Sequence, residues 1–234
     1  MSEIQNTGNN VQLNNGDLLV FVGLSTENSE ALKYSHLFSS LAASAQFFPT
    51  TEGQQWFQAY LQTMQTCGWL PIKFSYTKEV ASSQNLSVKN LLIKAVQAGL
   101  GFATGGASTI ATLGSVASEA FDTLAKNPEA TALFDRTNAE KEGTALSMAV
   151  CTQHANGEVM LSVGCMQSTE SPPGKTNVLV FEWSSSHSDT YTGAAALSFH
   201  RGLYDQVKET LIERVGDKSK KDVLTLSIEP KKRS

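Results

Sequence analysis

The spacing of apolar residues divides the chain into a helical first half and a stranded second half. Between residues 29 and 126 apolar side chains mostly recur at intervals of three and four, the period of an amphipathic helix. From residue 144 to 199 they alternate with small or polar side chains, the period of a strand. The pattern predicts helices at 29–46, 51–67, 87–126 (two helices broken at Gly105-Gly106) and 203–215. It predicts strands at 17–23 and 72–76, four strands within 144–199, and a closing strand at 223–228.

This order of elements predicts an α+β fold, with a helix-rich N-terminal half packed on an antiparallel meander sheet formed by the C-terminal half. The alternation leaves one face of the sheet apolar, so we expect the helices to cover that face. We expect residues 1–16 to form a flexible N-terminal segment and 17–229 a single α+β domain. Residues 230–234 then form a basic C-terminal tail.

The dipeptide Asn156-Gly157 predicts a hairpin between the first two strands of the second half. If these two residues are the centre of the turn, Cys151 lies opposite Ser162 and Cys165 opposite Met148. The two thiols would then lie on opposite faces of the hairpin and could not form a disulfide. We therefore expect Cys151, Cys165 and the remaining Cys67 to be reduced and buried.

The predicted helical hairpin at 87–126 contains no charged residue between Lys94 and Glu119. Small residues recur there at intervals of four, which lets two helix backbones approach closely, in a protein core or in a bilayer. Two interpretations follow: ordinary packing in the core, or a hairpin that leaves the core and enters a membrane. The candidate membrane or partner site comprises Leu100, Gly101, Phe102, Gly105, Gly106, Ile110, Leu113 and Gly114.

The low content and acidic balance of charged residues argue against nucleic acid as a partner. Only 17% of residues are charged and the net charge is −4, so the chain lacks the basic face that nucleic-acid binding requires. A weakly charged surface favours packing against copies of the chain or another protein. The first residues carry no secretory signal, and no apolar run reaches the ~18 residues of a membrane span. We expect a soluble protein made in the cytoplasm, with non-classical release as an open route.

Motifs for catalysis or cofactor binding are absent from the sequence. There is no nucleotide-binding glycine motif, and the four histidines lack the spacing of metal ligands. We expect His36 on a helix flank and Cys67 at a helix C-terminus, where a thiolate is not stabilised. The sequence predicts no catalytic residue, cofactor or metal. The other histidines are His154 beside the hairpin turn, His187 in a serine-rich turn, and His200.

These observations favour a non-catalytic protein that binds itself or another protein. The alternative is a membrane-active protein, similar in action to a pore-forming toxin, that uses the 87–126 hairpin. A third interpretation is an enzyme whose site is assembled from scattered residues and leaves no motif.

Overall fold

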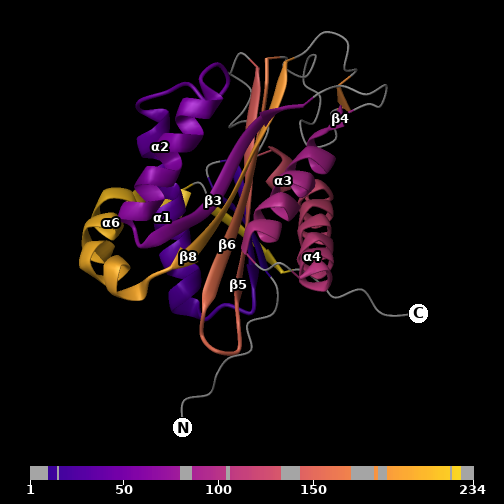
Figure 1. Cartoon of the computed structure of the whole chain (residues 1–234). Coiled ribbons are helices and arrows are strands. Elements are labelled where there is room, and N and C mark those ends of the chain that lie inside the picture. The colour runs from indigo at the N-terminus through magenta and orange to yellow at the C-terminus, as the bar shows by residue number, and fades with distance from the viewer. Residues whose placement is uncertain are drawn as a thin grey trace.

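A mixed β-sheet with helices on both faces organises the chain (Figure 1). The computed structural model describes residues 10–14, 16–79, 86–103, 106–132, 143–169, 182–183, 189–221 and 223–227. Within them, seven strands form one sheet in the order β3-β8-β6-β5-β2-β1-β9. These strands are β1 (Asn10–Asn14), β2 (Asp17–Val22), β3 (Trp69–Lys78), β5 (Thr144–Gln153), β6 (Val159–Ser168), β8 (Thr190–Phe199) and β9 (Val223–Ser227).

Two layers of helices enclose this sheet. One layer contains α1, α2 and α6, and the other contains α3 and α4, on the left and right of Figure 1. Each layer buries its own hydrophobic cluster against its own face of the sheet, so the protein has two cores. The helices are α1 (Thr26–Ser44), α2 (Gly53–Thr66), α3 (Val88–Ala103), α4 (Ala107–Ala125) and α6 (Arg201–Lys221).

The expectation that helices cover one face of the sheet was therefore wrong. The central strands β5 and β6 are buried along almost their whole length, on both faces. Residues that alternate with the large apolar ones, such as Ser147, Ala149 and Gly164, are small and uncharged rather than solvent-facing. Such residues admit a second helical layer, whereas charged residues at these positions would have kept one face in water.

The predicted meander order was wrong at its third strand, which does not lie between β6 and β8. β5, β6 and β8 are antiparallel neighbours, but β6 pairs directly with β8. From the predicted third strand, Glu182–Trp183 (β7) pairs with Leu86–Ser87 (β4) in a separate two-stranded sheet. Residues 177–181 of that predicted strand lie outside the described residues.

The N-terminal half also contributes strands, so the division into a helical half and a sheet half holds only in part. β2 lies beside β5 in parallel, which makes the sheet mixed. Residues 10–14 belong to the segment expected to be flexible, but they form β1, which pairs with β2 and β9. Val11 and Leu13 are buried in the core beneath α3 and α4, which explains why this polar-looking segment is ordered.

The predicted register of the β5–β6 hairpin was shifted by one residue. Gln153 pairs with Val159, so the turn is longer than a two-residue turn, with Gly157 at φ +86°. Cys151 therefore lies opposite Leu161, and Cys165 opposite Ser147. This places both thiols on the same face, not on opposite faces, but four residues apart along β6, or ~13 Å. That spacing is too long for a disulfide, and all three cysteines are free and buried.

Helix α3 lies unusually close to the sheet. A Cβ atom added to Gly99 would overlap Ser162 Oγ and lie 2.6 Å from the Ala195 carbonyl oxygen. One added to Gly164 on β6 would lie 2.8 Å from the Val96 backbone nitrogen. Ser162 Oγ donates a hydrogen bond to the Val96 carbonyl oxygen at 2.7 Å. The backbones of α3 and β6 are thus in near contact, and two glycines make this approach sterically allowed.

Candidate functional site

The predicted helical hairpin exists as α3 and α4, with a connection at residues 104–106. Helix α3 runs along β6 and β8, and α4 packs on α3 and reaches the sheet near β1 and β2 (Figure 1). Both helices bury an apolar stripe in the same core. The hairpin therefore occurs in a packed arrangement, which both interpretations expect of the protein away from a membrane.

The structure places the predicted hairpin residues at different depths. Leu100, Leu113 and Gly114 are buried, whereas Phe102, Gly106 and Ile110 are half-buried. Gly101 is exposed, and Gly105 lies outside the described residues. A Cβ atom on Gly114 would lie 2.5 Å from Gln97 Nε2, so this glycine gives α3 and α4 room to approach.

Charge on the hairpin is confined to the part farthest from its tip. Lys89 on α3 pairs with Asp122 on α4 at 2.5 Å, and Lys94 pairs with Glu79, just after β3, at 2.7 Å. Burial opposes ionisation of Glu79, but hydrogen bonds from Lys94 and Thr192 outweigh it and lower the pKa of this carboxyl group. Towards the tip, the exposed positions carry Ala98, Gly101 and Ala107 and similar neutral residues.

No helix in the described parts of the chain is long and apolar enough to cross a membrane.

A buried polar network on the opposite face of the sheet was not predicted. His36 on α1 is fully buried, and its Nδ1 lies 2.9 Å from the Tyr60 hydroxyl of α2. Its Nε2 lies 3.0 Å from Asp17 Oδ2 at the start of β2. Ser40 Oγ donates to the same carboxylate oxygen at 3.2 Å. The network thus joins a strand and two helices, and the expectation that His36 lies on a helix flank was wrong.

This network is not arranged as a nucleophile and its base. Ser40 donates to Asp17 rather than to His36, and both ring nitrogens of His36 already have partners. Tyr60 is also buried, and burial followed by the negative charge of Asp17 raises its pKa well above the ordinary value. Its hydroxyl therefore stays protonated. The geometry favours a structural or binding role over nucleophilic catalysis.

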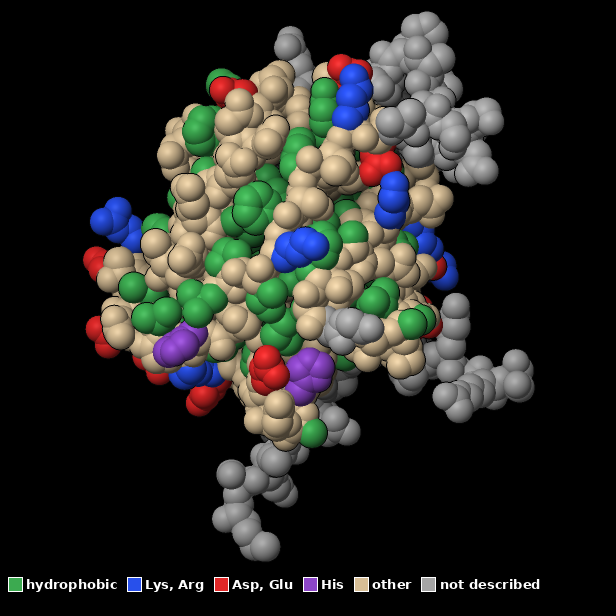
Figure 2. All heavy atoms as spheres, in the orientation of Figure 1, with side chains coloured by type: hydrophobic (Ala, Val, Ile, Leu, Met, Phe, Trp, Pro, Cys, Tyr) green, Lys and Arg blue, Asp and Glu red, His purple; other side chains and the backbone are tan. Residues whose placement is uncertain are grey.

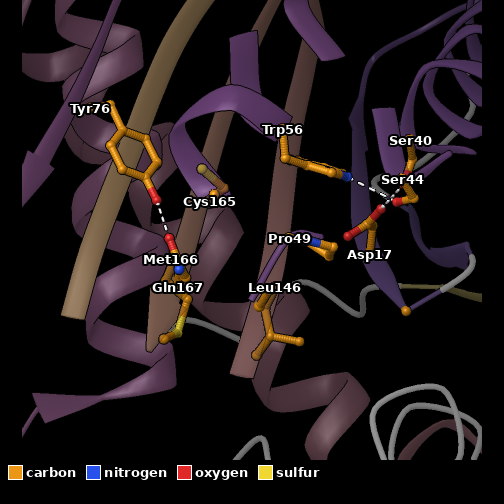
Figure 3. A pocket seen from close by; sticks show the side chains of 13 residues that line it. Asp17, Ser40, Ser44, Pro49, Trp56, Tyr76, Leu146, Cys165, Met166 and Gln167 are labelled. Atoms are coloured by element: carbon orange, nitrogen blue, oxygen red, sulfur yellow. Dashed lines mark hydrogen bonds between the residues drawn. The ribbon is translucent and has the colours of Figure 1, made fainter. Parts of the chain in front are cut away.

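A small cavity of about 50 Å³ adjoins the network, between the α1–α2 connection and the sheet. Figure 3 shows Asp17 and Trp56 on one side of it and Tyr76 and Gln167 on the other. The Trp56 indole N–H donates to Ser44 Oγ at 2.9 Å, and the Tyr76 hydroxyl donates to Gln167 Oε1 at 2.5 Å. Among the described residues that line the cavity, Asp17 is the charged one.

Comparison with known proteins gives only distant structural similarity. No protein-family model matches the sequence, and no curated protein matches it. One solved structure, described as a delta-endotoxin, is 12% identical with a TM-score of 0.41, covering 80% of this chain and 86% of that chain. Another, described as the Evf virulence factor, is 10% identical with a TM-score of 0.29, covering 93% and 83%. Similarity at this level does not indicate what this chain does.

The edge strand β3 carries exposed apolar side chains. Ile72 is 50% exposed and Phe74 is 48% exposed. β3 is the first strand of the sheet and pairs with β8 along its inner side. Figure 2 shows hydrophobic side chains gathered over the middle of the face on which β3 lies in front. The sequence predicted a strand at 72–76 but did not indicate that it would be an edge.

The remaining candidate groups form no site among the described residues. No cluster of three His, Cys, Asp or Glu side chains in these parts of the chain could hold a metal ion. Burial raises the pKa of the Cys165 thiol to about 12 and raises that of Cys151 as well. The same effect raises the pKa of Cys67. His154 lies beside the hairpin turn and is half-buried, and His187 lies outside the described residues.

Proposed function

We propose that the protein acts without catalysis, by binding protein, and that its first partner is a second copy of itself. The observation that carries this proposal is the exposed apolar edge at β3. An unpaired strand edge offers backbone donors and acceptors to another strand. Two copies related by a twofold axis would pair β3 with β3 and extend the sheet across the dimer.

The charges near β3 are compatible with such pairing. Edge strands often avoid association by presenting lysines, but the two lysines of β3 are both engaged within the chain. Lys73 Nζ lies 4.9 Å from the ring centroid of Phe102, and Lys78 pairs with Asp189 at 2.6 Å. The register irregularity after Pro71 leaves the segment from Lys73 to Lys78 as the regular part of the edge.

The substitution Phe74→Lys tests this proposal. We expect the wild-type chain to form a dimer in light scattering coupled to size-exclusion chromatography. The substitution should raise the dimer dissociation constant at least about tenfold, because it removes apolar burial twice per dimer and adds like charges. Phe48→Lys is the matched control, since Phe48 is 72% exposed but lies outside the sheet. A wild-type chain that stays monomeric at high concentration would contradict self-association.

A second candidate function is membrane activity of the α3–α4 hairpin. The observation that favours it is the neutral surface of the tip, where both the buried and the exposed positions between Ala95 and Ser118 lack charge. Moving a charge into a bilayer is costly, whereas small neutral residues insert at low cost and let helices associate. In the packed state, burial of each large side chain of the hairpin contributes roughly 1.5–3 kcal/mol, so release requires a lipid surface that replaces this burial.

A tether between α3 and the sheet tests this second candidate. In the variant Glu79→Cys/Lys94→Cys, a short bismaleimide should join the two positions that the ion pair connects. The native thiols are buried and should not react. If the hairpin inserts, wild-type protein should release dye from liposomes, and the cross-linked variant should not. The same variant treated with N-ethylmaleimide should retain the activity. Equal leakage from cross-linked and uncross-linked protein would exclude a role for hairpin release.

A further inference from the structure

The cavity beside Asp17 contains a buried acidic group whose imidazole partner, His36, is not among the residues that line the cavity. Asp17 is 8% exposed, and its hydrogen-bond partners in the described structure are His36 and Ser40. None of the described residues that line the cavity is a lysine or an arginine. A carboxylate is costly to bury unless a cation or several donors compensate it. Asp17 is therefore the acidic group that a cation entering the cavity would meet.

The walls of the cavity suit an organic cation better than a hydrated metal ion. One face of Trp56 stacks on Tyr60, with ring centroids 5.6 Å apart and planes at 8°, and Trp56 also lines the cavity. The Tyr76 ring and residues of β5 and β6, among them Ala145 and Cys165, also line the cavity. Aromatic rings attract cations through their quadrupole, most strongly at tryptophan.

The other polar groups of the cavity already have partners. Ser44 accepts the Trp56 indole N–H. Gln167 Oε1 accepts the Tyr76 hydroxyl, while Gln167 Nε2 donates to the Thr50 carbonyl oxygen. Among the described residues, the Asp17 carboxylate is thus the charged acceptor at the cavity. At ~10–15 Å³ per water, the cavity holds roughly three to five waters, the size of an ammonium group with one or two carbons.

We propose that this cavity binds a small primary ammonium ion, with Asp17 as its counter-ion and Trp56 as its aromatic wall. The ammonium group donates to the carboxylate, and its methylene groups contact the rings. A free amine and the headgroup of an ethanolamine lipid share this chemistry. The cavity shares Tyr76 with β3, but Asp17 and Trp56 belong to β2 and α2, so the proposal does not require the chain to dimerise.

Titration of the wild-type chain with ethylammonium chloride, followed by calorimetry or by amide NMR shifts, tests the proposal. We expect saturable binding, with shifts at the residues that line the cavity. Ethanol, which is similar in size but neutral, should bind at least about tenfold more weakly, because it lacks the charged hydrogen bond. Equal binding of ethanol, or no saturable binding of ethylammonium, would overturn the proposal.

Two variants separate a specific site from non-specific attraction. Asp17→Asn should weaken ethylammonium binding at least about tenfold, and Trp56→Leu should weaken it about threefold or more. Asp189→Asn, which removes an exposed carboxylate of the β3 edge region, should have no effect. If Asp17→Asn does not fold, the affinity for ethanol and the affinity of Trp56→Leu for ethylammonium test the proposal instead. Unchanged affinity in a folded Asp17→Asn variant would refute the assignment.

Co-sedimentation with vesicles distinguishes the two sources of the ammonium group. Binding to vesicles of phosphatidylethanolamine in phosphatidylcholine that is lost in Asp17→Asn would identify a lipid headgroup as the ligand. Binding of free ethylammonium without co-sedimentation would identify a free amine. Both results support the site, and failure of both would refute it.

Discussion

Replacing Gly99 by alanine should destabilise the protein by about 1–3 kcal/mol. Helix propensity alone predicts the opposite, because alanine is about 1 kcal/mol better than glycine inside a helix. The structure reverses the sign because the added Cβ atom would overlap Ser162 Oγ and press on the Ala195 carbonyl. Either α3 moves away from the sheet or the hydrogen bond from Ser162 to Val96 breaks. Urea denaturation followed by circular dichroism measures the change.

The matched control is Gly101→Ala, two residues further along the same helix. Gly101 is exposed, and an added Cβ atom would meet only Ile110 Cδ1, at 3.9 Å. This substitution should stabilise the protein by about 0.5–1 kcal/mol. If both variants gained stability, α3 would be free to shift from the sheet at little cost. That result would favour the view that the hairpin is easily released.

The substitution His36→Leu should cost about 3–5 kcal/mol, since it leaves the buried Asp17 carboxylate without its nearest partner. Tyr60 would lose its hydrogen bond as well. The loss should appear as a lower midpoint of urea unfolding without a change in slope. Tyr60→Phe is the graded comparison, because it keeps the ring stacked on Trp56 and Phe57 and removes one hydrogen bond. It should cost about 0.5–1.5 kcal/mol.

The two variants also separate the contribution of the His36–Asp17 contact from that of the Tyr60 hydrogen bond. A small effect of His36→Leu, equal to that of Tyr60→Phe, would mean that solvent reaches Asp17 and compensates its charge. A large effect limited to His36→Leu would locate the stabilisation in the contact between His36 and Asp17.

Periodicity was sufficient to predict most individual elements. The stripe that includes Trp56, Tyr60 and Met64 predicted α2, and the alternation around Val150 and Val163 predicted β5 and β6. Each pattern lies within one helix or strand, because it reflects the apolar face that this element buries. Serine, alanine and glycine on the opposite face of β5 and β6 were also a usable signal. Their lack of charge indicates burial on both faces.

The order of the strands in the sheet and their register could not be predicted from periodicity. The pattern of 177–183 predicted a strand but not its partner, and it did not show that β6 would pair with β8. The one-residue shift at Asn156-Gly157 came from turn geometry, and it reversed the expected placement of the two thiols. Register and order depend on contacts between distant segments, which a single sequence does not display.

Of the candidate sites, too, only the one formed by a continuous stretch of sequence could be predicted. The hairpin could be located because its composition is unusual over a continuous stretch. The network of His36, Asp17 and Tyr60 could not, because it joins residues from three separate elements. One signal was available: His36 and Ser40 are four residues apart, and so share a face of their helix.

The pairing of β1 with both β2 and β9 has a consequence for the rate of folding. β5, β6 and β8 come from one continuous region, and their pairing closes comparatively short loops. The other half of the sheet needs β2 to find β5, which lies far along the chain, and β1 to find β9, which lies near the opposite end. Closing such long loops is entropically slow. Refolding should therefore have an early phase at β5–β6–β8 and a late phase at β1–β2–β9, during which the backbone edge of β5 that β2 later pairs with is open to contact with other chains.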